Sequence, residues 1–62
     1  MAYAILKTQI EQYNIRLEKG MITKEAYEAF KVRTKKKMDV FMGIDDSRLT
    51  LEEYKSLDEL FV

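Results

Sequence analysis

The sequence contains no cysteine and no histidine. Without cysteine, disulfides and thiolate metal sites are excluded. Without histidine, zinc would have to be held by carboxylates alone, and the common nucleophile–base pairs of enzymes cannot be assembled. We therefore expect no catalytic residues, no metal site and no cofactor, and the sequence does not predict an enzyme.

Proline is also absent, and glycine occurs only twice, at Gly20 and Gly43. Lys, Glu, Leu, Met and Ala are plentiful, and this composition favours helix over most of the chain. No stretch approaches the roughly 18 apolar residues that a membrane span needs. The first residues, Met1 to Lys7, lack the basic start and long apolar middle of a signal peptide. We expect no membrane contact and a cytoplasmic location.

The chain has 62 residues, which predicts a single small domain spanning 1–62. Such a short chain buries only about 60% of its unfolded surface. Disulfides and metals are excluded as additional sources of stability, which leaves a partner chain. A homo-oligomer, most simply a dimer, is therefore the first expectation, with a different protein as the alternative partner.

A short pattern occurs twice: Ile22 to Tyr27 and Leu49 to Tyr54 each run aliphatic, Thr, any residue, acid, any residue, Tyr. A threonine in this position can cap a helix by accepting a hydrogen bond from the first turn, worth about 1 kcal/mol. The second copy also has Glu53 at the third helical position, which completes a capping box. The pattern therefore predicts two helix starts.

These starts and the two glycines predict an all-α fold of three helices, at about 2–19, 23–42 and 50–61. Gly20 fits the left-handed position just past a helix end, and Gly43 ends the second helix. The short link between the first two helices predicts an antiparallel hairpin. A polar loop, 44–48, precedes the third helix, which we expect to continue to the end of the chain.

Apolar residues recur at helical spacing in all three segments. In the first helix they form a short heptad-like seam, which fits a bundle helix or a short coiled coil, and Ile5 and Ile15 would widen its apolar face. The predicted inward residues are Leu6, Ile10, Tyr13, Leu17, Ile22, Tyr27, Phe30, Met38, Phe41, Leu49, Tyr54, Leu57 and Phe61.

The net charge of zero conceals a separation of charge along the chain. Residues 1–43 carry nine basic and five acidic side chains, a net +4, whereas residues 44–62 carry two basic and six acidic side chains, a net −4. The acidic third helix could therefore lie against the basic second helix of its own chain or of a neighbouring one.

A basic run in the second helix is the main candidate for binding, through Lys31, Arg33, Lys35, Lys36 and Lys37. Three interpretations stay open: a solvated face partly paired with the acidic third helix, a surface for nucleic-acid phosphates, or a surface for an acidic protein. The overall charge of zero argues against a dedicated nucleic-acid binder.

Aromatic residues form a second candidate surface. The chain has four tyrosines and three phenylalanines, more than the interior of so small a monomer can hold. Aromatic residues are enriched in the cores of protein interfaces. The candidates for such an interface are Tyr3, Tyr13, Phe41 and Phe61, and the alternative is that these rings are partly exposed.

The segment Leu17 to Tyr27, which reads Leu-Glu-Lys-Gly-Met-Ile-Thr-Lys-Glu-Ala-Tyr, resembles the Glu-Lys-Gly-x-Ile-Thr-x-Glu-x-Tyr segment of XkdX-like phage proteins. It is also similar to the short helical module called SHOCT, whose motif continues to a lysine that matches Lys31. The resemblance covers about residues 17–31. It implies a phage or prophage origin, and hence a virion-associated location, and it brings no catalytic residues.

Together these observations predict a small helical module that acts by protein–protein contact or assembly, without catalysis. The alternative is a small nucleic-acid-binding or regulatory protein that uses the basic second helix.

Overall fold

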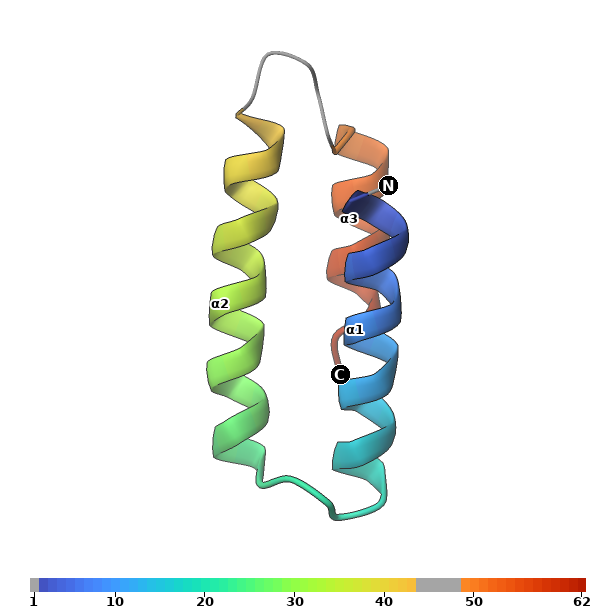
Figure 1. Ribbon diagram of the computed structural model, residues 1–62, viewed down its shortest axis with the longest axis vertical. Helices are drawn as coiled ribbons and strands as arrows, with labels where there is room; N and C mark the ends of the chain where they lie inside the picture. Colours follow the sequence, from blue (N-terminus) through green and yellow to red (C-terminus); the bar gives the residue numbers. More distant parts are fainter. Residues whose placement is uncertain (1, 44–48) are drawn as a thin grey trace.

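The computed structural model describes residues 2–43 and 49–62 and contains three α-helices, as predicted (Figure 1). Helix α1 spans Ala2–Glu18, α2 spans Lys24–Met42 and α3 spans Leu51–Leu60. The described part of the chain contains no strand, so the all-α fold class is confirmed. The predicted polar loop 44–48 lies outside the described residues.

The turn between α1 and α2 is built on Gly20. This glycine has a φ of 73°, in the left-handed region that glycine adopts without strain. Its N–H donates to the carbonyl of Leu17, and the Met21 N–H donates to the carbonyl of Arg16 at 2.8 Å. These two bonds are the pair that defines a Schellman motif, so the end of α1 is fixed by the residue that the sequence indicated.

Both predicted helix starts are confirmed. The Thr23 side chain accepts a hydrogen bond from the Ala26 N–H at 3.0 Å. The Thr50 side chain accepts from the Glu53 N–H at 3.1 Å, and the Glu53 carboxylate accepts in turn from the Thr50 N–H at 3.0 Å. The second start is therefore a complete capping box, and the first is a simple cap.

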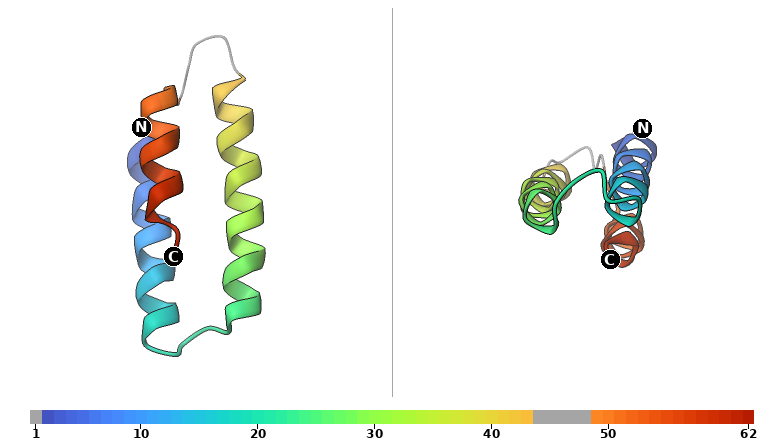
Figure 2. Two further views of the ribbon diagram at one scale, coloured as in Figure 1. Left: turned by 180° about the vertical axis from the view of Figure 1, so that it is seen from behind. Right: turned by 90° about the horizontal axis from the view of Figure 1, so that it is seen from below.

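The three helices form an elongated bundle of 39 × 17 × 16 Å. Helix α2 runs antiparallel to α1, and α3 runs parallel to α1 and lies behind it in the view of Figure 1 (Figures 1 and 2). Helix α3 packs against both other helices of its own chain. Because α3 is short, it extends along only part of the hairpin. It lies on one side of the hairpin, so the opposite side of α1 and α2 is uncovered.

The core lies along the axis of the bundle. Its buried apolar members are Leu6, Ile10, Tyr27, Phe30, Met38, Leu49 and Leu57. Every residue of the predicted inward face is buried or half-buried. Thr34, which was not among the predicted inward residues, is buried as well. Its spacing of four residues from both Phe30 and Met38 places it on the inward side of α2.

Two expectations about the edges of the core are wrong. Ile5 and Ile15 do not widen the apolar face of α1, because their side chains are 59% and 49% exposed. Helix α3 does not continue to the end of the chain, because Phe61 has an extended backbone (φ −64°, ψ 135°). That change of direction brings the Phe61 ring to within 6.3 Å of the Phe30 ring, measured between centroids.

Candidate interaction surfaces

A partly buried polar network joins the first turn of α2, the second half of α1 and the residues at the end of α3. Tyr27 is 1% exposed, and its hydroxyl donates to the Asn14 side-chain oxygen and accepts from the Val62 N–H at 3.1 Å. The Asn14 amide donates to the Leu60 carbonyl at 2.7 Å. The network satisfies backbone groups that the end of α3 leaves unpaired. It therefore holds the C-terminal residues against the hairpin.

Aromatic rings pack beside this network. Tyr13 of α1 stacks on Phe30 of α2, with centroids 3.7 Å apart and an angle of 2° between the ring planes. Tyr27 and Phe61 tilt against the same Phe30 ring at 6.1 and 6.3 Å. Phe30 thus gives the hairpin an aromatic contact with the C-terminal residues, beside the hydrogen bonds of Asn14 and Tyr27.

Two lysines of the basic run face α3. The Lys35 ammonium lies 2.9 Å from an Asp58 carboxylate oxygen, and this hydrogen bond raises the pKa of Lys35 above its usual value. The ammonium groups of Lys31 and Lys35 lie 5.7 and 6.0 Å from the centroid of the Phe61 ring, within the range of cation–π attraction. The sequence left open whether the acidic third helix pairs with the second helix of its own chain or of a neighbouring one. In the structure, α3 lies against α2 of its own chain.

A second polar contact ties α3 to α2. The Tyr54 hydroxyl donates to an Asp39 carboxylate oxygen at 3.0 Å. This hydrogen bond to the carboxylate raises the pKa of Tyr54, because loss of the phenolic proton would place two negative charges side by side.

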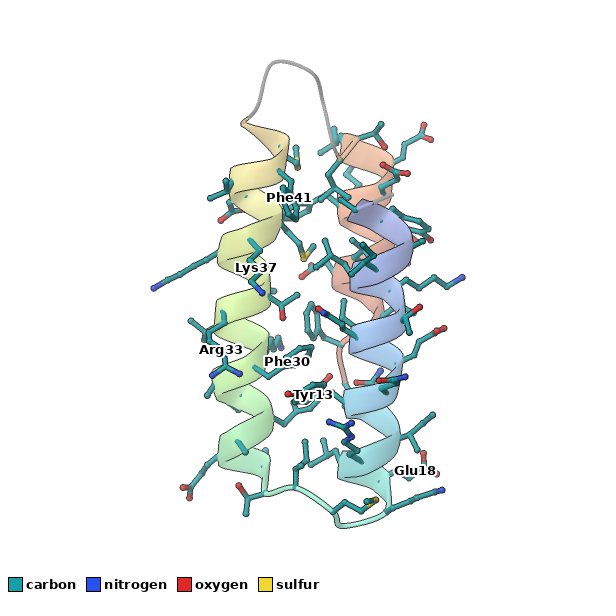
Figure 3. All side chains as sticks on the ribbon, viewed as in Figure 1. Tyr13, Glu18, Phe30, Arg33, Lys37 and Phe41 are labelled. Carbon is teal, nitrogen blue, oxygen red and sulfur yellow. The ribbon has the colours of Figure 1, made fainter. Side chains whose placement is uncertain are left out.

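The remaining cations of the run point elsewhere. Arg33, Lys36 and Lys37 are exposed, and Figure 3 shows Arg33 and Lys37 on the side of α2 that faces the viewer, away from α3. The five cations of the run therefore do not form one surface, since α2 presents them on at least two sides.

Arg16 of α1 lies on the side of its helix that faces α2, because it packs over the ring of Tyr13, which stacks on Phe30. Its guanidinium carbon is 5.2 Å from the centroid of the Tyr13 ring, and Tyr13 stacks on α2. Figure 3 shows the Tyr13, Phe30 and Phe41 rings between α1 and α2 on this side. We call Arg16, Arg33 and Lys37, with the half-buried rings of Tyr13 and Phe41, the basic face.

The helical period assigns no acidic residue of the described segments to the basic face. On α1, the residues on the stripe of Arg16 are Ile5, Gln9 and Gln12. On α2, the stripe of Arg33 and Lys37 continues through Ala26. The basic face therefore combines aromatic surface with three positive charges.

Acidic residues gather on a different side, along the contact between α1 and α3. Glu11 and Glu18 lie on the same stripe of α1 as Asn14, which contacts the end of α3. Glu52 and Glu59 lie on the same stripe of α3 as Ser56, whose hydroxyl is 3.4 Å from that of Tyr3 on α1. All four glutamates are exposed, and we call them the acidic seam.

The four rings proposed from the sequence as interface residues are half-buried and all pack against the core of their own chain: Tyr3, Tyr13, Phe41 and Phe61. Only Tyr13 and Phe41 border the basic face. Tyr3 faces α3, and Phe61 lies beneath Lys31 and Lys35.

Sequence reasoning missed Asn14, Arg16 and the acidic seam. A hint of the seam was present, because Glu11 and Glu18 are seven residues apart, as are Glu52 and Glu59, and residues at that spacing share one side of a helix. Asn14 gave no such hint, because its partners come from residues 46 and 13 positions away.

Within residues 2–43 and 49–62, no three acidic side chains are grouped so that they could hold a metal ion. Nor does any helix of these segments have the length and apolar character required to cross a membrane.

Comparisons of the chain with protein-family models, with curated proteins and with solved structures find no match. The resemblance of residues 17–31 to XkdX-like phage proteins and to SHOCT therefore stays a prediction.

Proposed function

We propose that the protein is a small helical interaction module that assembles through protein–protein contact and performs no catalysis. The basic face is the observation that supports this proposal. It is the side of the hairpin that α3 leaves uncovered, and it combines half-buried aromatic rings with arginine, the residue types that supply much of the binding energy in protein interfaces.

Stability gives a second argument for assembly. A core of this size supplies about 3–5 kcal/mol. The chain has no disulfide to add to it, and its one ion pair among the described residues is the largely solvated contact between Lys35 and Asp58. Such an ion pair contributes about 0–1 kcal/mol. Covering Tyr13 and Phe41 with a partner would bury further apolar area and stabilise the fold.

The partner that we propose is a second copy of the chain. Phage or prophage origin, with a virion-associated location, is part of the same proposal and rests on the resemblance of residues 17–31. If the gene is not phage-encoded, the expected location is cytoplasmic.

Sedimentation equilibrium over a concentration range tests the assembly. We expect the mean mass to rise reversibly with concentration. A monomer at every concentration up to about 0.5 mM, where an association as weak as about −4.5 kcal/mol would be visible, would overturn the proposal.

Nucleic-acid binding is the second candidate, favoured by the exposed Arg33, Lys36 and Lys37 on α2. Binding to mixed DNA and RNA should then be measurable at low salt and should weaken steeply as salt rises, because phosphate contacts release counterions. Absence of binding at low salt would rule this candidate out.

A further inference from the structure

The basic face and the acidic seam lie on different sides of the same molecule. On α1, Arg16 and Asn14 are two residues apart, which separates their side chains by about 200° around the helix. Arg16 lies over Tyr13 beside α2, whereas Asn14 contacts α3. Because Glu11 and Glu18 share the stripe of Asn14, the acidic seam and the basic face cannot meet within one chain.

The charges of the two surfaces are complementary. The basic face carries three positive charges, and the helical period places no acid beside them in the described segments. The acidic seam carries four negative charges, and Lys7 and Lys55 border it, so it keeps a net charge of −2. Glu11 and Glu18 are about 10.5 Å apart along the axis of α1, and Glu52 and Glu59 are the same distance apart along α3, which runs parallel to α1. This equal spacing offers a regular target for arginine and lysine side chains.

Pairing of two basic faces is unfavourable. In a symmetric dimer through this face, Arg16, Arg33 and Lys37 would meet the same three cations of the other copy. Like charges that face each other across an interface oppose association. The same reasoning applies to two acidic seams. An acidic seam against a basic face avoids both conflicts.

We propose, on the basis of the proposed function, that the basic face of one copy binds the acidic seam of the next. Such a contact is heterologous, because it joins two different surfaces. After one such contact, one copy keeps a free seam and the other keeps a free face, so the assembly grows head to tail into a ring or an open chain. It does not close as a dimer.

Two neutralised variants test this arrangement. The face variant, Arg33→Gln with Lys37→Gln, keeps the seam, and the seam variant, Glu52→Gln with Glu59→Gln, keeps the face. All four side chains are exposed, so we expect both variants to fold, which their circular dichroism verifies. A control, Lys24→Gln with Lys36→Gln, removes the same charge from α2 outside the basic face.

We expect the wild type to grow beyond a dimer in sedimentation velocity and native mass spectrometry. Each variant alone should have a dissociation constant raised about tenfold or more. An equimolar mixture of the two variants should recover wild-type affinity but stop at a 1:1 complex, because only one intact face and one intact seam remain. The control should assemble as the wild type does.

Each other outcome overturns the inference. If the wild type associates but neither variant differs from the control, the surfaces are wrong and the proposed function stands. If the wild type stops at a dimer, the contact is not head to tail. If the wild type is monomeric throughout the range, the inference and the proposed assembly fail together.

Discussion

The hydroxyl of Tyr27 is the most informative single group to remove from the fold. It belongs to a side chain that is 1% exposed. Among the hydrogen bonds of the described residues, it is the only atom that bonds both to Asn14 of α1 and to the backbone of Val62. The substitution Tyr27→Phe deletes this oxygen and keeps the ring that packs on Phe30.

The expected cost follows from the two hydrogen bonds that are lost. Each contributes a net of about 0.5–1.5 kcal/mol, so we expect Tyr27→Phe to lower the free energy of unfolding by about 2 kcal/mol. That is about half of the 3–5 kcal/mol expected for a core of this size. For a domain of about 60 residues, it corresponds to a fall in Tm of roughly 8–16 °C.

Urea and thermal unfolding, followed by circular dichroism at one protein concentration, measure this loss. Tyr13→Phe is the matched control, because Tyr13 also stacks on Phe30, but its hydroxyl makes no hydrogen bond to the described residues. We expect the control to change stability by less than about 0.5 kcal/mol. Equal effects of the two substitutions would refute the assigned network.

A double-mutant cycle with Asn14→Leu extends the same test. Asn14 and Tyr27 share one hydrogen bond and each holds a backbone group of the C-terminal residues. The two substitutions together should therefore cost less than the sum of the single ones, by about 1 kcal/mol. Strict additivity would show that the two side chains act independently.

Three further predictions concern the helix ends and the contact between α2 and α3. Gly20→Ala should lower the free energy of unfolding by about 1 kcal/mol, because alanine is strained at positive φ. Gly43→Ala is its control and should not destabilise, since Gly43 has a φ of −82° and an added Cβ would meet no atom closer than 3.5 Å. Thr50→Ala should cost about 1 kcal/mol in chemical unfolding, and Thr50→Ser should restore most of it, because serine can also cap. The raised pKa of Tyr54 makes its contribution to stability complete below the ordinary tyrosine pKa and lost as the pH rises through the folded value. The stability of the wild type should therefore fall more steeply than that of Tyr54→Phe above about pH 10, and identical pH profiles would contradict the bond to Asp39.

The helix boundaries were predictable because local interactions set them. The hydrogen bonds at and beside Thr23, Thr50 and Gly20 join residues three to five positions apart, so the information needed is contained in short sequence segments. The end of α3 depends instead on Phe61 meeting Phe30 and on Val62 meeting Tyr27, contacts that span more than 30 residues. No local pattern encodes those contacts, and the prediction of a helix to the end of the chain was accordingly wrong.

The candidate surfaces were predictable only in part. The sequence identified the basic run, but the helical period points its five cations, spread over residues 31–37, to different sides of α2. The packing of α3 then decides which of them face solvent. Lys31 and Lys35 turn toward Phe61 and Asp58, whereas Arg33 and Lys37 lie on the side of α2 away from α3. To predict a surface formed by two helices, one must know how the helices are aligned along each other, and no local sequence pattern gives this alignment.

The central claim is that the basic face of one copy binds the acidic seam of another. The most direct test is to record nuclear magnetic resonance spectra of the isotope-labelled protein over a dilution series. Amide signals should move with concentration in two groups, around Arg16, Arg33 and Lys37 and around the four glutamates of the seam. Both groups should return to their dilute positions when salt is added, because salt screens the charges. Signals that do not change with concentration, or that change only on the outer side of α2 around Val32 and Lys36, would contradict the claim.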